Sequence, residues 1–581
     1  MGKEKEKKKK KNQVPLRMNI LFVIVFLLFS ALILRLGMIQ IVEGEEFKRS
    51  AEATENVVSK TNTPRGKIFD RRGNIVVDNN PVFNLVYTRQ RNVSGTEMLE
   101  IAQKLANLIE KDASALTERD LKDYYIISRG QSELMNEKLS ESERGELEDD
   151  ELYQLLLDRI DENDLAEISN SELEIAAIWR EMNSGYALSE QVIKENVTKK
   201  EYAVINERLS ELPGVDIQSD GERVYPYEET LRALIGDTGK IPKEKTEYYA
   251  AKGYDLNDEV GTSGIELQYE DVLSGIKEKK KYITDKSGET IGEPEIIPGQ
   301  RGKDLTLSID MRYQKEVEKI IQNAISKNRR YGVDSAYVVV MNPKAGEVLS
   351  LAGKRIEGGK WIDDSAGTYL KTFLPGSSVK GATVLTGLTN GVIKPGEVIY
   401  DRTLNFNGLQ KGSYQDLGPV NDLTALERSS NVYMFYIGMR LAGFNYDCYC
   451  WTGDQTGDPA FRAAIQKYRE MFHQFGLGVP TGIDLPYEAT GYKGSTLALG
   501  LVADFGIGQY DTYTPLQLAQ YVSTIANDGY RMKPQLVTEI RERGVNGEPG
   551  ELIKRFEPEL LNRVNADPEY IERVQNGFYR V

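Results

Sequence analysis

Residues 374–381, LPGSSVKG, place a serine and a lysine three positions apart. The segment that follows, SSVKGATVLTGLTNG (377–391), has small and apolar residues at helical spacing and ends in Asn-Gly, which is typical of a helix stop. The pattern therefore predicts a helix with Ser377 at its N-terminus. Because residues i and i+3 share one face of a helix, the Lys380 ammonium can reach the Ser377 hydroxyl.

Ser377 needs a base, since a serine hydroxyl is a poor nucleophile until a neighbouring group takes its proton. The chain has one histidine, His473, in an amphipathic helical stretch, where a half-buried packing role is favoured over a catalytic one. Lys380 is the better candidate, because burial among apolar residues or a second cation lowers the pKa of a lysine. The positive end of the predicted helix would also stabilise an oxyanion beside Ser377.

A second polar element lies further along the chain, in LTALERSSNVYMFYIG. It contains Ser429 and Asn431, a hydroxyl and a carboxamide two positions apart, which together can relay a proton and hold a substrate amide. Each element alone has a structural alternative, a helix N-cap, because serine and asparagine are favoured there.

Charge divides the chain into a basic tail and an acidic body. Residues 1–17 carry eight basic and two acidic side chains, a net charge of +6, which leaves −21 for the rest of a chain whose total is −15. A protein that binds nucleic acid needs a basic face, so an acidic body argues against a nucleic-acid partner.

The tail is followed by an apolar span, residues 18–42, long enough to cross a bilayer as a helix. An uncleaved single-pass anchor is favoured over a signal peptide, because the apolar stretch continues past Arg35 without a small-residue cleavage site. Lysines on the amino side keep that end in the cytoplasm, so residues 43–581 are expected outside the cell membrane.

The two cysteines, Cys448 and Cys450, are expected to be ordinary thiols in a loop, because a bridge between them would close no sizeable loop. With one histidine in the chain, a zinc site would need carboxylates to complete its ligands. Neither a metal nor another cofactor is expected.

The rest of the chain predicts a multidomain α+β fold. In residues 43–299, Arg72, Gly73 and Asn74 supply turn chemistry between two β-like runs, and residues 97–212 are mostly amphipathic helix. A second domain is expected over residues 300–581. It begins with a strand (DLTLSID), a helix (MRYQKEVEKIIQNAISK) and a hairpin (AYVVVM and EVLSLA around NPKAG), and Thr514-Pro515 starts a helix that ends near Asn527.

These elements together resemble a class B penicillin-binding protein, a monofunctional peptidoglycan transpeptidase, of the elongation type found in Gram-positive, rod-shaped bacteria. The motifs that carry the resemblance occur in the family's order: PRGKIFDRRGN, RVYPY, GTSGIE, LPGSSVK, SSN, TGIDLP and GIGQYDTYTPLQLAQ. The resemblance implies an N-terminal membrane anchor, an elongated α+β stalk (pedestal) domain of the dimerisation type, and a transpeptidase domain with helices around an antiparallel sheet.

The resemblance also implies roles. Ser377 would be the acylated nucleophile and Lys380 its general base, while Ser429 and Asn431 would complete the proton relay and contact the substrate. The substrate would be a peptidoglycan stem peptide ending in D-Ala-D-Ala, and β-lactams would acylate Ser377. Membrane proteins of the elongation machinery, including a glycosyltransferase, would be partners, and no cofactor is implied.

One family element, a Lys-Thr-Gly strand, has no counterpart before Val581, and YKGST (492–496) differs from it in spelling and place. The sequence is therefore expected to stop short of a longer protein, with its transpeptidase domain incomplete at the C-terminus. Alternatives are an inactive paralogue, a non-catalytic scaffold for wall synthesis, and a transpeptidase of low β-lactam affinity that confers resistance.

The predicted topology can be tested with intact protoplasts. Because eight basic residues precede the apolar span, protease added outside should digest residues 43–581 and spare the tail, which immunoblots against each part would detect. Protection of the large domain would contradict this orientation.

Overall fold

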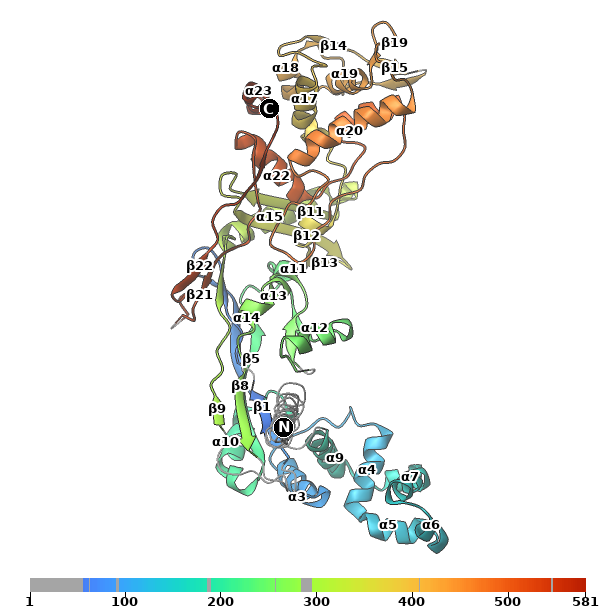
Figure 1. The fold of residues 1–581 in the computed structure, drawn as a ribbon, viewed down its shortest axis with the longest axis vertical. Helices are drawn as coiled ribbons and strands as arrows, with labels where there is room; N and C mark the ends of the chain where they lie inside the picture. The colour runs from blue at the N-terminus through green and yellow to red at the C-terminus, as the bar shows by residue number, and fades with distance from the viewer. Residues whose placement is uncertain are drawn as a thin grey trace, which may run out of the picture. The chain divides into compact units, whose positions relative to one another are not determined.

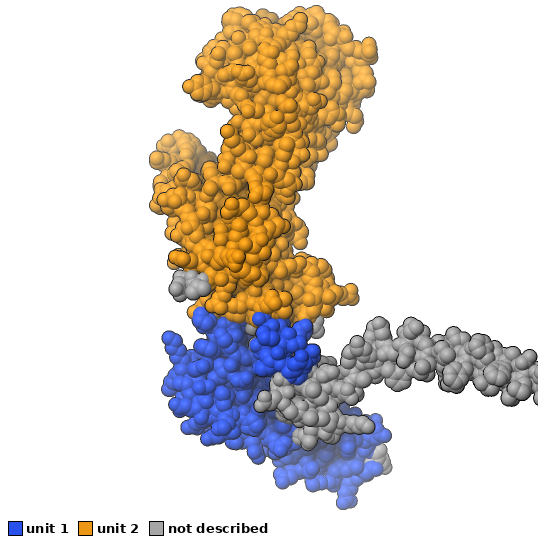
Figure 2. Space-filling view, turned by 60° about the vertical axis from the view of Figure 1, so that its left-hand side comes forward, with its two compact units in different colours: residues 1–62, 81–220, 277–299 blue, residues 63–80, 221–276, 300–581 orange. Residues whose placement is uncertain are grey.

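The computed structural model describes residues 56–61, 63–89, 93–184, 190–255, 258–283, 295–406, 408–544 and 547–581. The expected tail (1–17) and anchor (18–42) lie outside these residues. Among the described residues, no helix combines the length and the hydropathy that a bilayer-spanning segment requires. The chain divides into two compact units, coloured separately in Figure 2: unit 1 has residues 1–62, 81–220 and 277–299, and unit 2 has residues 63–80, 221–276 and 300–581.

Unit 1 is mainly helical, as the sequence predicts for residues 97–212. Most of its helices start at serine, threonine or aspartate N-caps, several in capping boxes such as those of Ser94 and Thr117. Their apolar faces form one core with Leu105 and Ile178 fully buried. Strand β4 within this region was not predicted; it pairs with the end of β3. The elements are α3 (Gly95–Ala106), α4 (Glu118–Arg129), α5 (Gln131–Lys138), α6 (Glu141–Glu146), α7 (Asp149–Arg159), α8 (Glu162–Ala166), α9 (Asn170–Asn183), α10 (Lys199–Arg208), β1 (Asn56–Thr61), β4 (Glu190–Lys194), β8 (Glu278–Ile283) and β9 (Glu295–Ile297).

Unit 2 begins with a sheet whose strands run in the order β22-β21-β10-β2-β3. The predicted turn after Phe69 is present: the Asp70 carboxylate accepts hydrogen bonds from the backbone N–H groups of Arg72 and Asn74, and Gly73 has φ +83°. The elements of this part are β2 (Ile68–Phe69), β3 (Ile75–Thr88, which continues into unit 1), β5 (Val215–Val224, which begins in unit 1), β6 (Thr238–Lys240), β7 (Glu259–Gly261), β10 (Asp304–Leu307), β21 (Val537–Arg541), β22 (Leu552–Arg555), α11 (Arg232–Ile235), α12 (Thr246–Ala251), α13 (Gly264–Gln268) and α14 (Glu270–Leu273).

Four buried charges join three of the sequence motifs in unit 2. The Arg65 guanidinium, from PRGKIFDRRGN, donates hydrogen bonds to the carboxylates of both Glu266 and Glu270. Arg223, from the segment that contains RVYPY, forms an ion pair with the other oxygen of Glu266 at 2.7 Å. The side chain of Glu266, in GTSGIE, is 0% exposed, so its charge depends on these two arginines.

The predicted hairpin is β11 (Ser335–Met341) and β12 (Val348–Glu357), which pair antiparallel. Within the described residues, β13 (Lys360–Asp363) completes a three-stranded sheet of order β11-β12-β13. The predicted helix α15 (Met311–Asn328) packs on β12 through Ile321 and Ile325, both buried.

The remaining helices form the largest core of the molecule. Figure 1 shows α17 (Lys380–Thr389) beside α19, α20 and α23, which contact it. Every residue from Lys380 to Leu388 is buried, and helices supply this cover. The other elements are α16 (Gly367–Leu370), α18 (Asp422–Glu427), α19 (Asn431–Leu441), α20 (Asp458–Gln474), α21 (Leu499–Gly506), α22 (Pro515–Ala526), α23 (Pro568–Tyr579), β14 (Ile399–Asp401), β15 (Leu404–Phe406), β16 (Leu409–Lys411), β17 (Gly418–Val420), β18 (Phe444–Asn445), β19 (Cys450–Trp451), β20 (Tyr530–Met532) and β23 (Leu560–Arg563).

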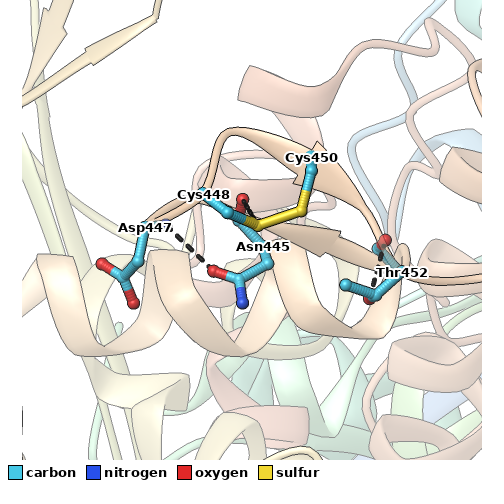
Figure 3. Close-up of a disulfide and its surroundings, with 6 residues drawn as sticks. Asn445, Asp447, Cys448, Cys450 and Thr452 are labelled. Carbon is cyan, nitrogen blue, oxygen red and sulfur yellow. Dashed lines mark hydrogen bonds between the residues drawn. A yellow bond between two sulfur atoms is a disulfide. The ribbon is translucent and has the colours of Figure 1, made fainter.

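The expectation of two free thiols is wrong, because Cys448 and Cys450 form a disulfide (Figure 3). Cys448 lies in the turn between β18 and β19, and Cys450 is the first residue of β19. The turn brings their Cα atoms to 5.3 Å, within the range that a disulfide spans. The loop-entropy argument concerns how much a bridge stabilises the fold, whereas the local turn decides whether the bridge can form.

The buried ion cluster predicts a large effect for Arg65→Met in urea unfolding of the detergent-solubilised protein. Removing this guanidinium leaves the buried Glu266 with Arg223 and takes the cation from the buried Glu270, so the free energy of unfolding should fall by about 3–5 kcal/mol. Lys319→Met is the control, because Lys319 pairs with Glu316 at the surface, and it should cost less than about 1 kcal/mol. Equal decreases in the free energy of unfolding for the two substitutions would contradict a stabilising role of Arg65 in this cluster.

Candidate active site

The serine segment begins as a tight turn and continues as a helix. Gly376–Val379 is a 3₁₀ turn, and Lys380 is the first residue of α17, so the regular helix starts three residues later than the sequence predicts. The predicted stop is confirmed, with Asn390 as C-cap and Gly391 at φ +68°. Ser377 lies in the exposed turn, whereas Lys380, one turn further, is only 2% exposed.

The GIGQ segment holds the serine turn in place. Gly376 donates its backbone N–H to the carbonyl of Gly508, which has φ +73°. A Cβ at Gly508 would lie 2.2 Å from the Gly376 carbonyl oxygen, so both the conformation and the close approach require glycine. The side chain of Thr383, in α17, adds a hydrogen bond to the carbonyl of Gly506 at 2.8 Å. This Gly-x-Gly segment therefore has a structural role.

The Lys380 ammonium meets three oxygen acceptors, all uncharged. Its Nζ donates to the Ser429 carbonyl oxygen at 2.8 Å, to Ser429 Oγ at 3.0 Å and to Asn431 Oδ1 at 2.7 Å. The structure thus brings together three of the four candidate residues. The fourth, Ser377, makes no side-chain hydrogen bond within the described part of the chain, and its exposed hydroxyl is accessible to a substrate.

Ser429 occupies an unusual backbone conformation. Its φ is +54°, in the left-handed region that residues with a side chain rarely adopt. This conformation lets both its carbonyl oxygen and its hydroxyl face the same ammonium. Backbone strain of this kind persists where the surroundings impose it, and it is concentrated at functional sites.

Asn431 is the first residue of α19 and is fixed on both sides of its amide. Its Nδ2 donates to the Gly412 carbonyl oxygen at 3.1 Å, which orients Oδ1 toward Lys380. The N-cap alternative holds for the residue between the two candidates: Ser430 Oγ accepts from the N–H of Tyr433 at 3.0 Å. Ser429 and Asn431 are therefore available for contacts with Lys380 and a substrate.

Burial lowers the pKa of Lys380 to about 8, and the negative charge of Asp401 opposes that decrease. An amine with a pKa near 8 has an appreciable neutral fraction at physiological pH, and this neutral form can accept a proton.

His473 lies at the end of α20, half-buried. Burial lowers its pKa, and the charges of Lys493 and Arg469 add to that effect. In the described residues, no hydrogen bond joins His473 to Ser377 or Lys380. This agrees with the packing role that the sequence favoured.

Residues 492–496, YKGST, do not supply the third family element. The segment is irregular backbone without a strand, and Gly494 is held by Arg469 and Asp511. Residues that the sequence analysis did not single out also contribute to the site: Gly412 and Ser413, which contact Asn431, and the buried Asp401. They lie in no recognisable motif, and only the fold brings them to α19.

Comparison with known families assigns both domains of this fold. Residues 60–307 match the penicillin-binding protein dimerisation domain, and residues 336–581 match the penicillin-binding protein transpeptidase domain. The chain therefore belongs to the penicillin-binding proteins that combine these two domains.

Individual relatives agree with this assignment. The chain is 44% identical to penicillin-binding protein 2A of Bacillus subtilis, over 100% of this chain and 82% of that protein. The crystallised penicillin-binding protein 2B of Streptococcus pneumoniae strain 5204 superposes with a TM-score of 0.75 at 30% identity, covering 90% of this chain and 86% of that one. The peptidoglycan D,D-transpeptidase MrdA of Escherichia coli is 25% identical over 64% of this chain and 60% of its own length.

Proposed function

We propose that this protein is a serine D,D-transpeptidase that crosslinks peptidoglycan stem peptides during cell-wall elongation. The observation that carries the proposal is the buried Lys380, one turn from an exposed serine. Among the described residues, its ammonium donates to neutral acceptors alone. Membership of the transpeptidase family and the likeness to named D,D-transpeptidases support the reaction type.

In the first step, neutral Lys380 takes the proton of Ser377 Oγ as this oxygen attacks the carbonyl of the penultimate D-alanine. The bond to the terminal D-alanine breaks, and that residue leaves with a proton returned from the site. Ser377 then carries the stem peptide as an ester. An amine from a neighbouring stem attacks the ester, gives up its proton and restores Ser377, so the crosslink forms without a cofactor.

Ser429 and Asn431 fit two supporting roles. Ser429 Oγ lies 3.0 Å from Lys380 Nζ, so it can pass a proton between the amine and the leaving nitrogen. Asn431 holds the amine by its Oδ1, and its carboxamide can contact the backbone of the stem peptide. The Ser377 hydroxyl, the Lys380 amine, the Ser429 hydroxyl and the Asn431 carboxamide then act together at the N-terminal ends of α17 and α19.

The same resemblance supports the wider proposal. Residues 1–17 would be a cytoplasmic tail and 18–42 a single-pass anchor, followed by a stalk (43–299) and the transpeptidase domain (300–581) outside the cell. Membrane proteins of the elongation machinery, including a glycosyltransferase, would be partners. β-Lactams would resemble the D-Ala-D-Ala terminus and remain attached to Ser377, which makes the protein an antibiotic target and a possible site of resistance.

Labelling by a fluorescent penicillin, with the protein expressed from its own gene, tests these roles. Ser377→Ala should abolish the covalent label, and Lys380→Ala should lower the labelling rate by about 10²–10⁴-fold, the usual size of a general-base contribution. His473→Ala should leave the rate nearly unchanged. Because only the neutral amine accepts a proton, the wild-type rate should rise as the pH is raised through about 8.

Two outcomes would contradict the proposal. Label that survives in Ser377→Ala would show that Ser377 is not the nucleophile. Loss of label in His473→Ala, together with normal labelling in Lys380→Ala, would show that His473 and not Lys380 is the base. A folded wild-type protein that takes no label at any pH would instead favour a non-catalytic scaffold.

A further inference from the structure

The strongest unassigned feature near the site is Asp401, at the end of β14. Its side chain is completely buried. One carboxylate oxygen, Oδ2, accepts hydrogen bonds from two hydroxyls, Ser413 Oγ at 2.6 Å and Ser430 Oγ. The other, Oδ1, is also buried and has no hydrogen-bond partner among the described residues. Burying a carboxylate costs free energy, so the presence of Asp401 at this position requires an explanation.

The two serines connect Asp401 to the first turn of α19 by hydrogen bonds. Each hydroxyl gives its one proton to the carboxylate, so its lone pairs face other donors. Ser413 Oγ accepts from the backbone N–H of Asn431 at 2.9 Å, and Ser430 Oγ accepts from that of Tyr433 at 3.0 Å. Two of the first N–H groups of α19 are thereby satisfied.

The negative charge of Asp401 also lies near the N-terminus of α19, where a helix favours a negative charge. Backbone N–H groups at a helix N-terminus carry partial positive charge, so a carboxylate behind two hydroxyls stabilises that end. Asn431 is the first residue of this turn, and its Oδ1 lies 2.7 Å from Lys380 Nζ. A chain of hydrogen bonds therefore runs from Asp401 through Ser413 to Asn431 and Lys380.

We propose that Asp401 is a positioning residue for the reaction: through Ser413 and Ser430 it holds the first turn of α19, and with it the amide and the amine that act on the substrate. The proposal rests on the function proposed above. Asp401 is not a catalytic residue, because both serines lie between it and the reacting groups.

The charge of Asp401 gives the proposal a second consequence. The groups that face Lys380 directly, Ser429 and Asn431, are uncharged. Nearby, Lys411 of β16 and Asp504 of α21 form an ion pair, so their charges largely offset each other. The hydroxyl of Tyr521, which accepts from the N–H of Ala382 in α17, is neutral because burial raises its pKa. The negative charge of Asp401 therefore opposes the lowering of the Lys380 pKa by burial.

The test is the pH profile of acylation by a fluorescent penicillin in wild type, Asp401→Asn and Asp416→Asn. Asparagine keeps the shape of Asp401 and removes its charge, so burial then acts on Lys380 unopposed and the midpoint of the profile should move to lower pH by about one unit. Asp416 lies in the same region but is exposed, and within the described residues its carboxylate accepts hydrogen bonds from Thr403 alone, so its variant should match wild type. An unchanged midpoint in Asp401→Asn, or a shift to higher pH, would overturn the proposal.

Ser413→Ala tests the positioning of Asn431 separately from the charge of Asp401. It also provides a test if Asp401→Asn does not fold. It breaks the link to Asn431 but keeps the carboxylate, so the plateau rate should fall by about tenfold, the effect of losing roughly 1.4 kcal/mol of positioning, while the midpoint stays in place. A plateau equal to that of wild type would contradict the positioning chain. Failure of the proposed function is distinguishable, because either wild type would then take no label or Ser377→Ala would retain it, whatever the Asp401 variant does.

Discussion

The site depends on one constraint: an amine must be buried deeply enough to lose its proton near neutral pH and still be held in place. Lys380 meets both conditions because helices enclose α17 and because three uncharged oxygens accept from its Nζ. A carboxylate in direct contact would hold the amine in place and keep it charged. With carbonyl, hydroxyl and amide acceptors, burial is free to lower the pKa of the amine.

The surrounding architecture serves this constraint through close backbone approaches. Gly508 lies against Gly376 and fixes the turn that presents Ser377, while Ser429 adopts a left-handed conformation that turns two oxygens toward Lys380. Further away in unit 2, Arg65, Arg223 and Glu266 join three motifs that carry no chemistry of their own. Their role is to hold the strand β2 and helix α13 together as one body.

Local patterns explain why much of this could be predicted from the sequence. Helix α15, the β11–β12 hairpin and the turn after Asp70 follow from periodicity and turn residues within short windows, and all three are present. The start of α22 at Thr514 and Pro515 was predicted for the same reason. Ser377, Lys380, Ser429 and Asn431 were found because the members of each pair lie within three positions of each other in the sequence, although their roles remain proposals.

The features that were missed depend on contacts between distant segments or on fine local geometry. Asp401 and Ser413 lie in loops and short strands with no motif, and only the fold brings them to the first turn of α19. The Cys448–Cys450 disulfide depends on how tightly the β18–β19 turn closes, which composition does not show. Likewise, β4 is a short strand that pairs with a segment about a hundred residues earlier, so the local sequence of this mainly helical region does not predict it.

The central claim, that Lys380 is a buried amine with a lowered pKa, can be measured directly by NMR titration of the lysine side chains. With lysines labelled at Cε, the Lys380 signal is identified by its absence from the Lys380→Arg variant. The account predicts a midpoint near pH 8, well below that of an ordinary lysine at about 10.4. A Lys380 signal that titrates with the exposed lysines would contradict it, because the amine would then be charged when Ser377 has to lose its proton.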